Sequence, residues 1–512
     1  MRKVFLVNPS NVTASYSFIT PRWLFVLAGA TPVSLVGDPI LVDECLEKFN
    51  PEQVSPGDVV GIGINSGNCI PGYRVLKQAK ERGATVVVGG IHATIFPDEP
   101  LEMGADAVVT GNGDQVWSQV VRDVLNGGLR RRYDGGSVSG DAMVKARWDL
   151  LDPARYMMAS IQTIAGCPEN CSFCSVWVTE GRKPRQRLVD TVIQEANELY
   201  QLGYRYVVFA DDNFNPATKA RIAREPSAQT RRYLETLREE RLKFFEEYHR
   251  GAPQNLYAFT QMTSEVVDDS EYLAAMRDKM RIRTALIGVE SFDVEGLASA
   301  NKQWNPAGHT MVQTIQKIQD SGILVLASFI CGLESDTVQS LRSLRRHAID
   351  CGAVLAQFTI YYPLPGTKDY HEMKKDLVNL ETPGYVRKHR TRIEEERFWL
   401  YPGRRAHAVS YANIRSSDLI RENAACWSAY YSVSAILKRI RTGVGRSWPV
   451  AGKVAYFFIC LVFKRIYAEH GVAADSVQRG KAGVITKVLI RAGVTVYSSF
   501  FRKKRFQFRV QV

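Results

Sequence analysis

The first 125 residues alternate short apolar runs with amphipathic stretches. Runs rich in β-branched residues occupy positions 3–7, 59–64, 85–88 and 107–109, and each is followed by small or turn-forming residues. Continuous apolar runs of this length are typical of parallel strands that are buried on both faces. The pattern therefore predicts an α/β domain built on a parallel, Rossmann-like sheet.

Glycines follow three of these predicted strands. Gly67 comes after the second, Gly89 and Gly90 after the third, and Gly111 and Gly113 after the fourth. Glycine lets a ligand approach the backbone closely, and open parallel sheets bind ligands at the carboxyl ends of their strands. A simple turn is the alternative for any single glycine. The recurrence of small residues at four strand ends favours a ligand site.

A second strand and helix rhythm begins after a glycine-rich polar connection at 126–140. Apolar runs at 157–164, 206–209, 256–261, 283–289, 325–330 and 357–361 alternate with amphipathic stretches such as 188–201 and 311–321. Six successive βα units predict a partial (β/α)6 TIM-like barrel with its active site at the strands' carboxyl ends. Beyond residue 370 the chain becomes charged and then apolar and basic. We predict three domains: 1–140, the barrel at 141–375, and a mainly helical C-terminal region at 376–512.

Charge is concentrated at one end of the chain. The net charge is +13, and residues 435–512 hold 16 Lys or Arg but only two acidic residues. The longest apolar stretch there, 454–463, is about half of what spans a bilayer, so no transmembrane helix is expected. A mixture of apolar and basic residues suits a helix in an anionic membrane interface, and a packed helical cap is the alternative. We expect a cytoplasmic protein with peripheral contact at the inner face of the membrane.

Three cysteines lie within eight residues, directly after the first predicted barrel strand. They are Cys167, Cys171 and Cys174, and no other Cys or His lies between positions 140 and 248. Thiolates are ligands for iron–sulfur clusters or zinc, and a closed zinc site needs four ligands. The trio is one ligand short of a zinc site. The spacing therefore favours an iron–sulfur cluster with one iron open to another ligand.

This C-x3-C-x2-C loop, with the aromatic Phe173 before its last cysteine, resembles the radical S-adenosylmethionine (SAM) superfamily. The resemblance implies a [4Fe-4S] cluster held by the three cysteines. It implies that SAM binds the open iron and is cleaved to a 5′-deoxyadenosyl radical. It also implies an electron donor of the flavodoxin or ferredoxin type.

The same resemblance assigns SAM contacts at the ends of later strands. Asp211 and Asp212 stand where relatives orient the SAM ammonium, with helix capping or a turn as the alternative. Glu290 and Ser291 would bind the ribose or the amino group, with a surface ion pair as the alternative for the carboxylate. The complete set of implied SAM contacts is Phe173, Asp211, Asp212, Glu290, Ser291, Ile330, Gly332 and Pro365.

The N-terminal unit ahead of this barrel resembles the cobalamin-binding subclass of the superfamily, chiefly over 88–94, 97–99 and 105–114. Asn112 departs from the Gly-Glu-Gly-Glu of many relatives. The Asp-x-His-x-x-Gly motif that supplies histidine to cobalt is absent, so His92 either lines the nucleotide-tail pocket or is a hydrogen-bonded loop histidine. The expected cobalamin contacts are Ser66, Gly89, Gly90, His92, Gly111 and Gly113.

Together these cofactors imply methylation of an unactivated carbon, on a lipid such as a hopanoid or on a natural product. Oxidative cyclisation or rearrangement with the same cofactors is the alternative. A tRNA-modifying enzyme is a rival from another class, but the methylthiotransferase type would carry a cysteine-bearing N-terminal domain. Here that region has only Cys45 and Cys69, so nucleic acid is not the expected partner. A non-catalytic corrinoid or cluster sensor would leave Asp211, Asp212 and Glu290 unexplained.

Overall fold

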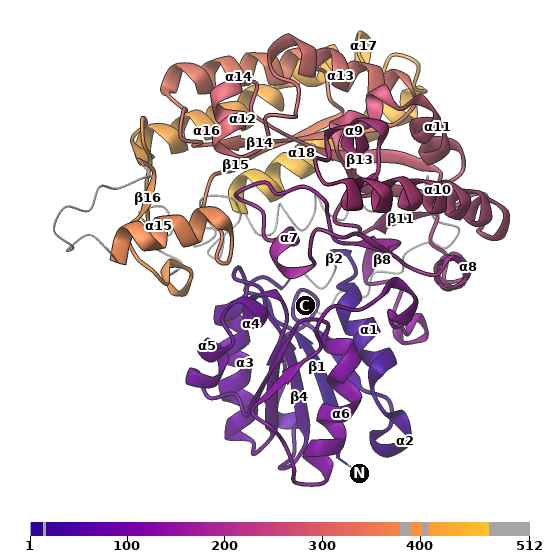
Figure 1. Ribbon diagram of the computed structural model, residues 1–512, viewed down its shortest axis with the longest axis vertical. Helices are drawn as coiled ribbons and strands as arrows, with labels where there is room; N and C mark the ends of the chain where they lie inside the picture. The colour runs from indigo at the N-terminus through magenta and orange to yellow at the C-terminus, as the bar shows by residue number, and fades with distance from the viewer. Residues whose placement is uncertain (1, 14–16, 379–389, 402–407, 471–512) are drawn as a thin grey trace. The chain divides into compact units, whose positions relative to one another are not determined.

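The computed structural model describes residues 2–13, 17–378, 390–401 and 408–470 (Figure 1). The chain divides into two compact units. The first contains Met1–Pro168, Ser175–Ala210 and Gly251–Leu256. The second contains Glu169–Cys174, Asp211–Arg250 and Tyr257–Val512.

The first unit is built on a six-stranded parallel sheet of order β3-β1-β4-β5-β6-β7. Its strands are β1 (Val4–Asn8), β3 (Ile40–Asp43), β4 (Val59–Gly63), β5 (Thr85–Gly89), β6 (Ala107–Thr110) and β7 (Arg132–Asp134). In Figure 1, helices α3 (Cys69–Glu81), α4 (Ile91–Ile95) and α5 (Asp98–Glu102) cover one face, and α1 (Arg22–Ala30) and α6 (Gly113–Leu125) cover the other. The apolar runs are buried on both faces, as the sequence pattern predicts.

Three short strands of the parallel sheets escape the sequence pattern. They are β2 (Ser17–Ile19), β3 and β7. Residues 126–140 look like a polar connection in the sequence, yet they contain β7, which pairs with β6 from Val108↔Arg132 to Thr110↔Asp134. Only Tyr133 of β7 is buried, so no apolar run marks this edge strand.

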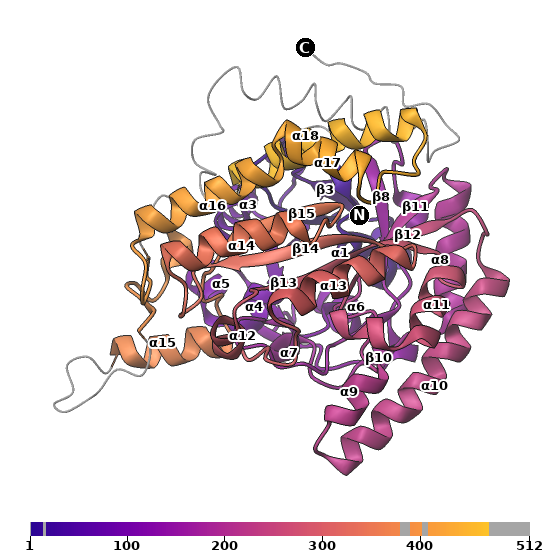
Figure 2. The same ribbon diagram turned by 90° about the horizontal axis from the view of Figure 1, so that it is seen from above.

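The strands of the predicted partial barrel follow in chain order. In the first unit, β2, β8 (Tyr156–Ile161) and β11 (Tyr206–Phe209) are parallel, and α8 (Val189–Gln201) packs against β8. The second unit has β12 (Tyr257–Met262), β13 (Ile282–Glu290), β14 (Leu324–Cys331) and β15 (Leu355–Ile360), which are also parallel. The connections include α10 (Ala228–Gly251), α11 (Ser270–Asp278), α13 (Gly308–Asp320) and α14 (Val338–Asp350) (Figure 2). The α/β class and the partial barrel are confirmed.

The described part of the C-terminal region is mainly helical, as expected, with α16 (Ser416–Tyr430), α17 (Val433–Arg441) and α18 (Val450–His470). Side chains at the end of α16 hydrogen-bond the backbone of β15. Asn423 Nδ2 and Trp427 Nε1 donate to Phe358 O at 3.1 and 2.9 Å, and the Tyr431 hydroxyl donates to Ala356 O at 2.7 Å. No helix of the described residues combines the length and apolar character of a membrane span.

A buried ion pair organises the first unit around α8. Glu195 Oε1 lies 2.8 Å from Arg187 Nη2 and 3.2 Å from Arg22 Nη2, and the Glu195 side chain is fully buried. Burial raises the pKa of the Glu195 carboxyl, but the guanidiniums of Arg22 and Arg187 outweigh it and lower the pKa overall. The carboxylate therefore stabilises the fold above the unfolded pKa of about 4.3, and this stability is lost as pH falls through the lower folded value.

Replacing Glu195 by Gln is expected to lower the free energy of unfolding by about 3 kcal/mol, because two guanidiniums lose their counter-charge in the interior. Urea unfolding at neutral pH measures the change. Glu198→Gln is the matched control, since Glu198 lies on the same helix in a half-exposed pair with Lys145. It should change stability by less than about 0.5 kcal/mol. Equal effects of the two substitutions would contradict the role of Glu195.

Candidate functional site

The segment that carries the last two of the three clustered cysteines is braced by hydrogen bonds. Within the second unit, Ser172 N donates to Ala300 O at 3.1 Å, and Asn301 Nδ2 donates to Asn170 O at 2.9 Å. Ser172 Oγ also donates to Asp369 Oδ2 at 3.1 Å. Cys171 is buried, whereas Cys174 is half-buried. The first cysteine, Cys167, belongs to the first unit, where its N–H donates to Gly181 O at 3.2 Å.

A buried ionic network anchors the same loop through Glu169. Its Oε1 lies 3.1 Å from both Arg221 Nε and Arg224 Nη2 on α9 (Lys219–Arg224). Arg224 also reaches Glu265 at 2.8 Å. Sequence reasoning missed this network. Its only signal was a carboxylate between the first two cysteines and two arginines spaced three apart on a short helix.

Glu290 ends β13 in a left-handed backbone conformation, with φ of 62°, just after a register shift against β14. Its Oε1 lies 2.7 Å from Lys302 Nζ, which also donates to Gly288 O at 2.9 Å. A Cβ at Gly288 would lie 2.2 Å from Glu290 Oε1 and 2.7 Å from Lys302 Nζ. The carboxylate predicted from the sequence is therefore in a buried ion pair, and a side chain at Gly288 would have to displace the Glu290 carboxylate and the Lys302 ammonium. Lys302 was not predicted.

The charges of Glu290 and Lys302 affect the pKa of Cys171 in the cysteine loop. Burial raises the pKa of the Cys171 thiol to about 12, the Lys302 ammonium lowers it, and the Glu290 carboxylate raises it. Both charges of the pair therefore lie close enough to the sulfur to influence it. The structure brings together Cys171 and Glu290, which the sequence analysis named separately.

All the other predicted SAM contacts belong to the second unit. Phe173 lies in the cysteine loop, and the rest lie at or shortly after the ends of strands. Asp211 is fully buried and Asp212 is half-buried, and their segment is held by Phe214 N, which donates to Gln261 O at 2.9 Å. Gly332 has φ of 103°, and its N–H donates to Asp336 Oδ2 at 2.8 Å. Ser291, Ile330 and Pro365 are buried and Phe173 is half-buried. Their contacts with SAM stay predictions.

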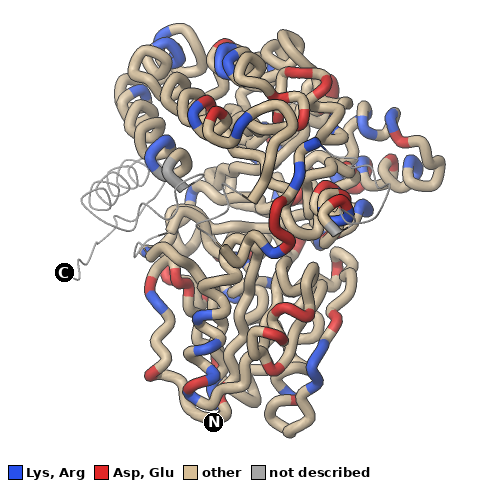
Figure 3. The backbone as a smooth tube through the Cα atoms, turned by 90° about the vertical axis from the view of Figure 1, so that its left-hand side faces the viewer, with Lys and Arg blue, Asp and Glu red and all other residues tan. Residues whose placement is uncertain are grey.

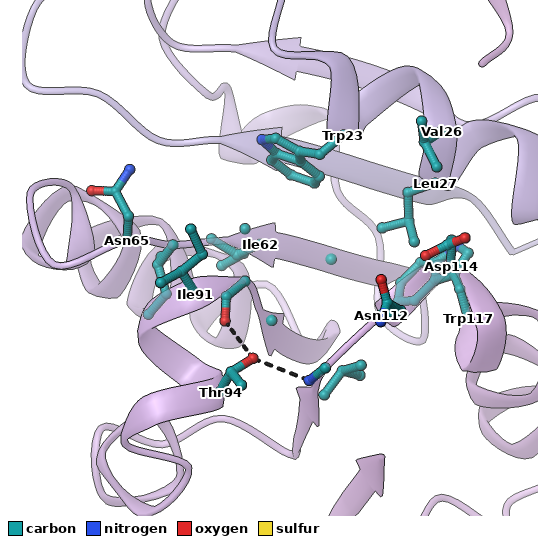
Figure 4. A pocket seen from close by; sticks show the side chains of 18 of the residues that line it. Trp23, Val26, Leu27, Ile62, Asn65, Ile91, Thr94, Asn112, Asp114 and Trp117 are labelled. Carbon is teal, nitrogen blue, oxygen red and sulfur yellow. Dashed lines mark hydrogen bonds between the residues drawn. The ribbon is translucent and has the colours of Figure 1, made fainter. Parts of the chain in front are cut away.

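A cavity of about 360 Å³ lies within the first unit at the carboxyl ends of β4, β5 and β6 (Figure 4). Four of the six predicted cobalamin contacts line it: Gly89, Gly90, Gly111 and Gly113. Thr94 Oγ1 joins two of these turns, because it donates to Gly90 O at 3.0 Å and accepts from Gly111 N at 3.1 Å. Trp23 and Trp117, which the sequence analysis did not name, supply apolar walls.

The other two predicted contacts, Ser66 and His92, are not among the residues that line this cavity. His92 is fully buried, with Nδ1 2.9 Å from Ser66 Oγ and Nε2 2.8 Å from Glu99 Oε1. The Tyr73 hydroxyl donates to the same Glu99 oxygen at 2.7 Å. This geometry corresponds to the hydrogen-bonded loop histidine of the two alternatives. A cobalamin contact of Ser66 or His92 stays a prediction.

Comparisons with known proteins find related sequences. An uncharacterised methyltransferase of Synechocystis, sll1242, is 29% identical over 59% of this chain and 53% of its own length. The anaerobic magnesium-protoporphyrin IX monomethyl ester cyclase of Rubrivivax gelatinosus is 26% identical over 72% of this chain and 69% of its own. The bacteriochlorophyllide d C-12(1)-methyltransferase of Chlorobaculum tepidum is 24% identical over 75% and 81%. The chain thus spans about half to four fifths of these relatives.

Solved structures share the fold. The radical SAM methyltransferase TsrM from Kitasatospora setae superposes with a TM-score of 0.56 at 17% identity, over 75% of this chain and 79% of that protein. The cobalamin-dependent SAM radical enzyme OxsB superposes with a TM-score of 0.57 at 12% identity, over 98% of this chain and 79% of that protein. The profile of the radical SAM superfamily matches residues 161–348, which span the cysteine loop and strands β11 to β14. This part of the chain, residues 161–348, is thus a radical SAM domain.

Proposed function

We propose that this protein is a cobalamin-dependent radical SAM enzyme that methylates an unactivated carbon atom. One observation carries the proposal. A single chain joins a C-x3-C-x2-C loop to a Rossmann-like unit whose cavity is edged by glycines at strand ends. The methyltransferase names of sll1242 and of the C-12(1) enzyme support methyl transfer as the reaction.

The cysteine loop fits a [4Fe-4S] cluster. Three thiols leave one iron without a protein ligand, and thiolates are the ligands that such clusters take. Buried Cys171 has a raised pKa as a free thiol, so its thiolate would form when the metal binds. The carboxylates of Asp211 and Glu290 have the charge that would suit a ligand's ammonium or hydroxyl groups.

The glycine-edged cavity fits part of a corrinoid. Its volume falls within the range of ligand pockets, and its walls combine indole rings with backbone at strand ends. Gly90 has φ of 96°, and a Cβ there would lie 2.6 Å from Ile64 O. Glycine at this position thus lets the β5 turn pack closely on the β4 turn, and both turns line the cavity.

When bound, the cluster with SAM supplies a 5′-deoxyadenosyl radical and cobalamin supplies the methyl group. The chain's own residues bind and orient these groups and exclude water. Lys302 holds Glu290 Oε1, which leaves Oε2 to a ligand. A flavodoxin or ferredoxin would deliver the electron.

Oxidative cyclisation is the second candidate reaction. The cyclase of Rubrivivax gelatinosus aligns over 72% of this chain, a share similar to that of the C-12(1)-methyltransferase. The named substrates of both relatives are tetrapyrroles, and the hopanoid C-2 methylase of Rhodopseudomonas palustris is 24% identical over 45% of this chain. These names support a large, mostly apolar substrate. Lys and Arg are interspersed with Asp and Glu along each unit in the view of Figure 3, which does not favour a nucleic-acid substrate.

Cys171→Ala should abolish the cluster, because two thiolates cannot hold a cubane at full occupancy. After anaerobic reconstitution with iron and sulfide, we expect loss of the cluster's visible absorption and of 5′-deoxyadenosine formation from SAM. Cys331→Ala is the control, since Cys331 is buried in β14. It should retain both signals. A normal cluster in the Cys171 variant would refute the assignment.

Leu27→Trp should block corrinoid binding while leaving the cluster intact, because the Leu27 side chain lines the cavity and a larger indole would fill it (Figure 4). Corrinoid retained after incubation with hydroxocobalamin and gel filtration is measured by absorption. Leu35→Trp, at an exposed site on α2 (Val33–Val36), should retain corrinoid like the unsubstituted chain. Failure of the unsubstituted chain to retain corrinoid would remove cobalamin from the proposal.

We further propose peripheral membrane contact through α18. Most of the basic tail, residues 471–512, lies outside the described residues. Val450, Val454 and Phe458 are exposed one turn apart along α18. Such a stripe suits an interfacial helix. Val454→Glu with Phe458→Glu should lower flotation with anionic vesicles several-fold, whereas Val33→Glu on α2 should not. Equal flotation of both variants would exclude α18 from membrane contact.

A further inference from the structure

The segment that follows α12 (Val294–Ser299) lies directly against the cysteine loop. Two hydrogen bonds join them: Ser172 N donates to Ala300 O at 3.1 Å, and Asn301 Nδ2 donates to Asn170 O at 2.9 Å. Asn301 has φ of 50°, and its N–H donates to Ala298 O. Lys302 is the next residue, so its backbone position relative to the cysteine loop is closely determined.

Lys302 is buried although it carries a charge. Its side chain is 9% exposed, and its ammonium is held by Glu290 Oε1 at 2.7 Å and Gly288 O at 2.9 Å. Lysine is rarely buried, because removing its charge from water is costly unless a partner compensates. Trp304 adds to the site, since the Lys302 ammonium lies 5.3 Å from the centre of its ring. These contacts keep the ammonium beside the cysteine loop.

We propose that Lys302 is a positioning residue that offsets the charge of Glu290 beside the cluster and so raises the reduction potential of the cluster. The inference rests on the proposed function, because it requires a [4Fe-4S] cluster on the cysteine loop. Lys302 itself would not bind the metal. Its charge would affect the transfer of an electron to the cluster, and not the later reaction of the substrate.

A charge close to a redox centre shifts the reduction potential of that centre. Reduction adds an electron to the cluster, so a nearby positive charge favours the reduced state and a nearby negative charge opposes it. Lys302 follows Ala300 and Asn301, which hydrogen-bond Ser172 and Asn170 on either side of Cys171, and its ammonium is paired with Glu290. The interior screens charges less than water does, so the effect is larger than that of surface charges. Lys302 also holds one oxygen of Glu290 and thereby orients the carboxylate.

The test is a redox titration of the reconstituted full-length protein without SAM, followed by electron paramagnetic resonance of the reduced cluster. Lys302→Met should lower the midpoint potential, because Glu290 is then uncompensated. Glu290→Gln should raise it. The double variant should lie near the unsubstituted chain, and Lys302→Arg should stay closer to it than Lys302→Met. Lys243→Met removes a largely exposed lysine of the same unit and should change nothing.

Iron and sulfide content is measured first in every variant, so that cluster loss is separated from a shift in potential. Intact clusters with the same potential in Lys302→Met and Glu290→Gln would overturn the inference and leave the proposed function standing. If the Lys302→Met variant does not hold a cluster, the Glu290→Gln variant provides the test. An unchanged midpoint potential in the Glu290→Gln variant would also overturn the inference. No cluster in the unsubstituted chain would refute the proposed function itself.

Discussion

Parallel strands that are buried on both faces have no polar surface along their length. In strands such as β4, β5 and β14 the interior is almost entirely apolar, and hydrogen-bonding or charged groups follow at the strand ends. Because all strands of a parallel sheet end at the same edge, residues far apart in sequence meet there. The glycine-edged cavity of the first unit and the Glu290 site of the second are both consequences of this constraint.

The sequence was sufficient for elements whose signal is local. Apolar runs identified β4, β5 and β11 almost to the residue. The cysteine spacing likewise predicts a metal-binding loop. Strands β2, β3 and β7 were missed because they are short and partly exposed. They form by hydrogen bonding to a neighbouring strand, and no run of apolar residues marks them in the sequence. Lys302 was missed for a related reason. It reaches Glu290 only because β13 ends in a bulge and a left-handed residue, and neither feature has a sequence signal.

The histidine of the first unit illustrates a different limit. Its position after Gly89 and Gly90 suggested proximity to a ligand, and it does lie one residue from Ile91, which lines the cavity. The side chain turns the other way, toward Ser66 and Glu99. Sequence places a residue on a turn, but the direction of the side chain depends on which buried partner can satisfy both ring nitrogens. Here that partner was a carboxylate seven residues further along.

A partial barrel has an open side, and β15 lies at that side of the second unit. Phe358 O of β15 accepts hydrogen bonds from Asn423 and Trp427, and Ala356 O accepts one from Tyr431. Tyr456 donates to Val354 O, just before the strand. An exposed strand edge with free backbone groups is a template for pairing with another chain. Because side chains of the C-terminal helices occupy these carbonyls, a strand from a second molecule would have to displace them. The C-terminal helices therefore protect the edge of β15 from pairing with a strand of another molecule.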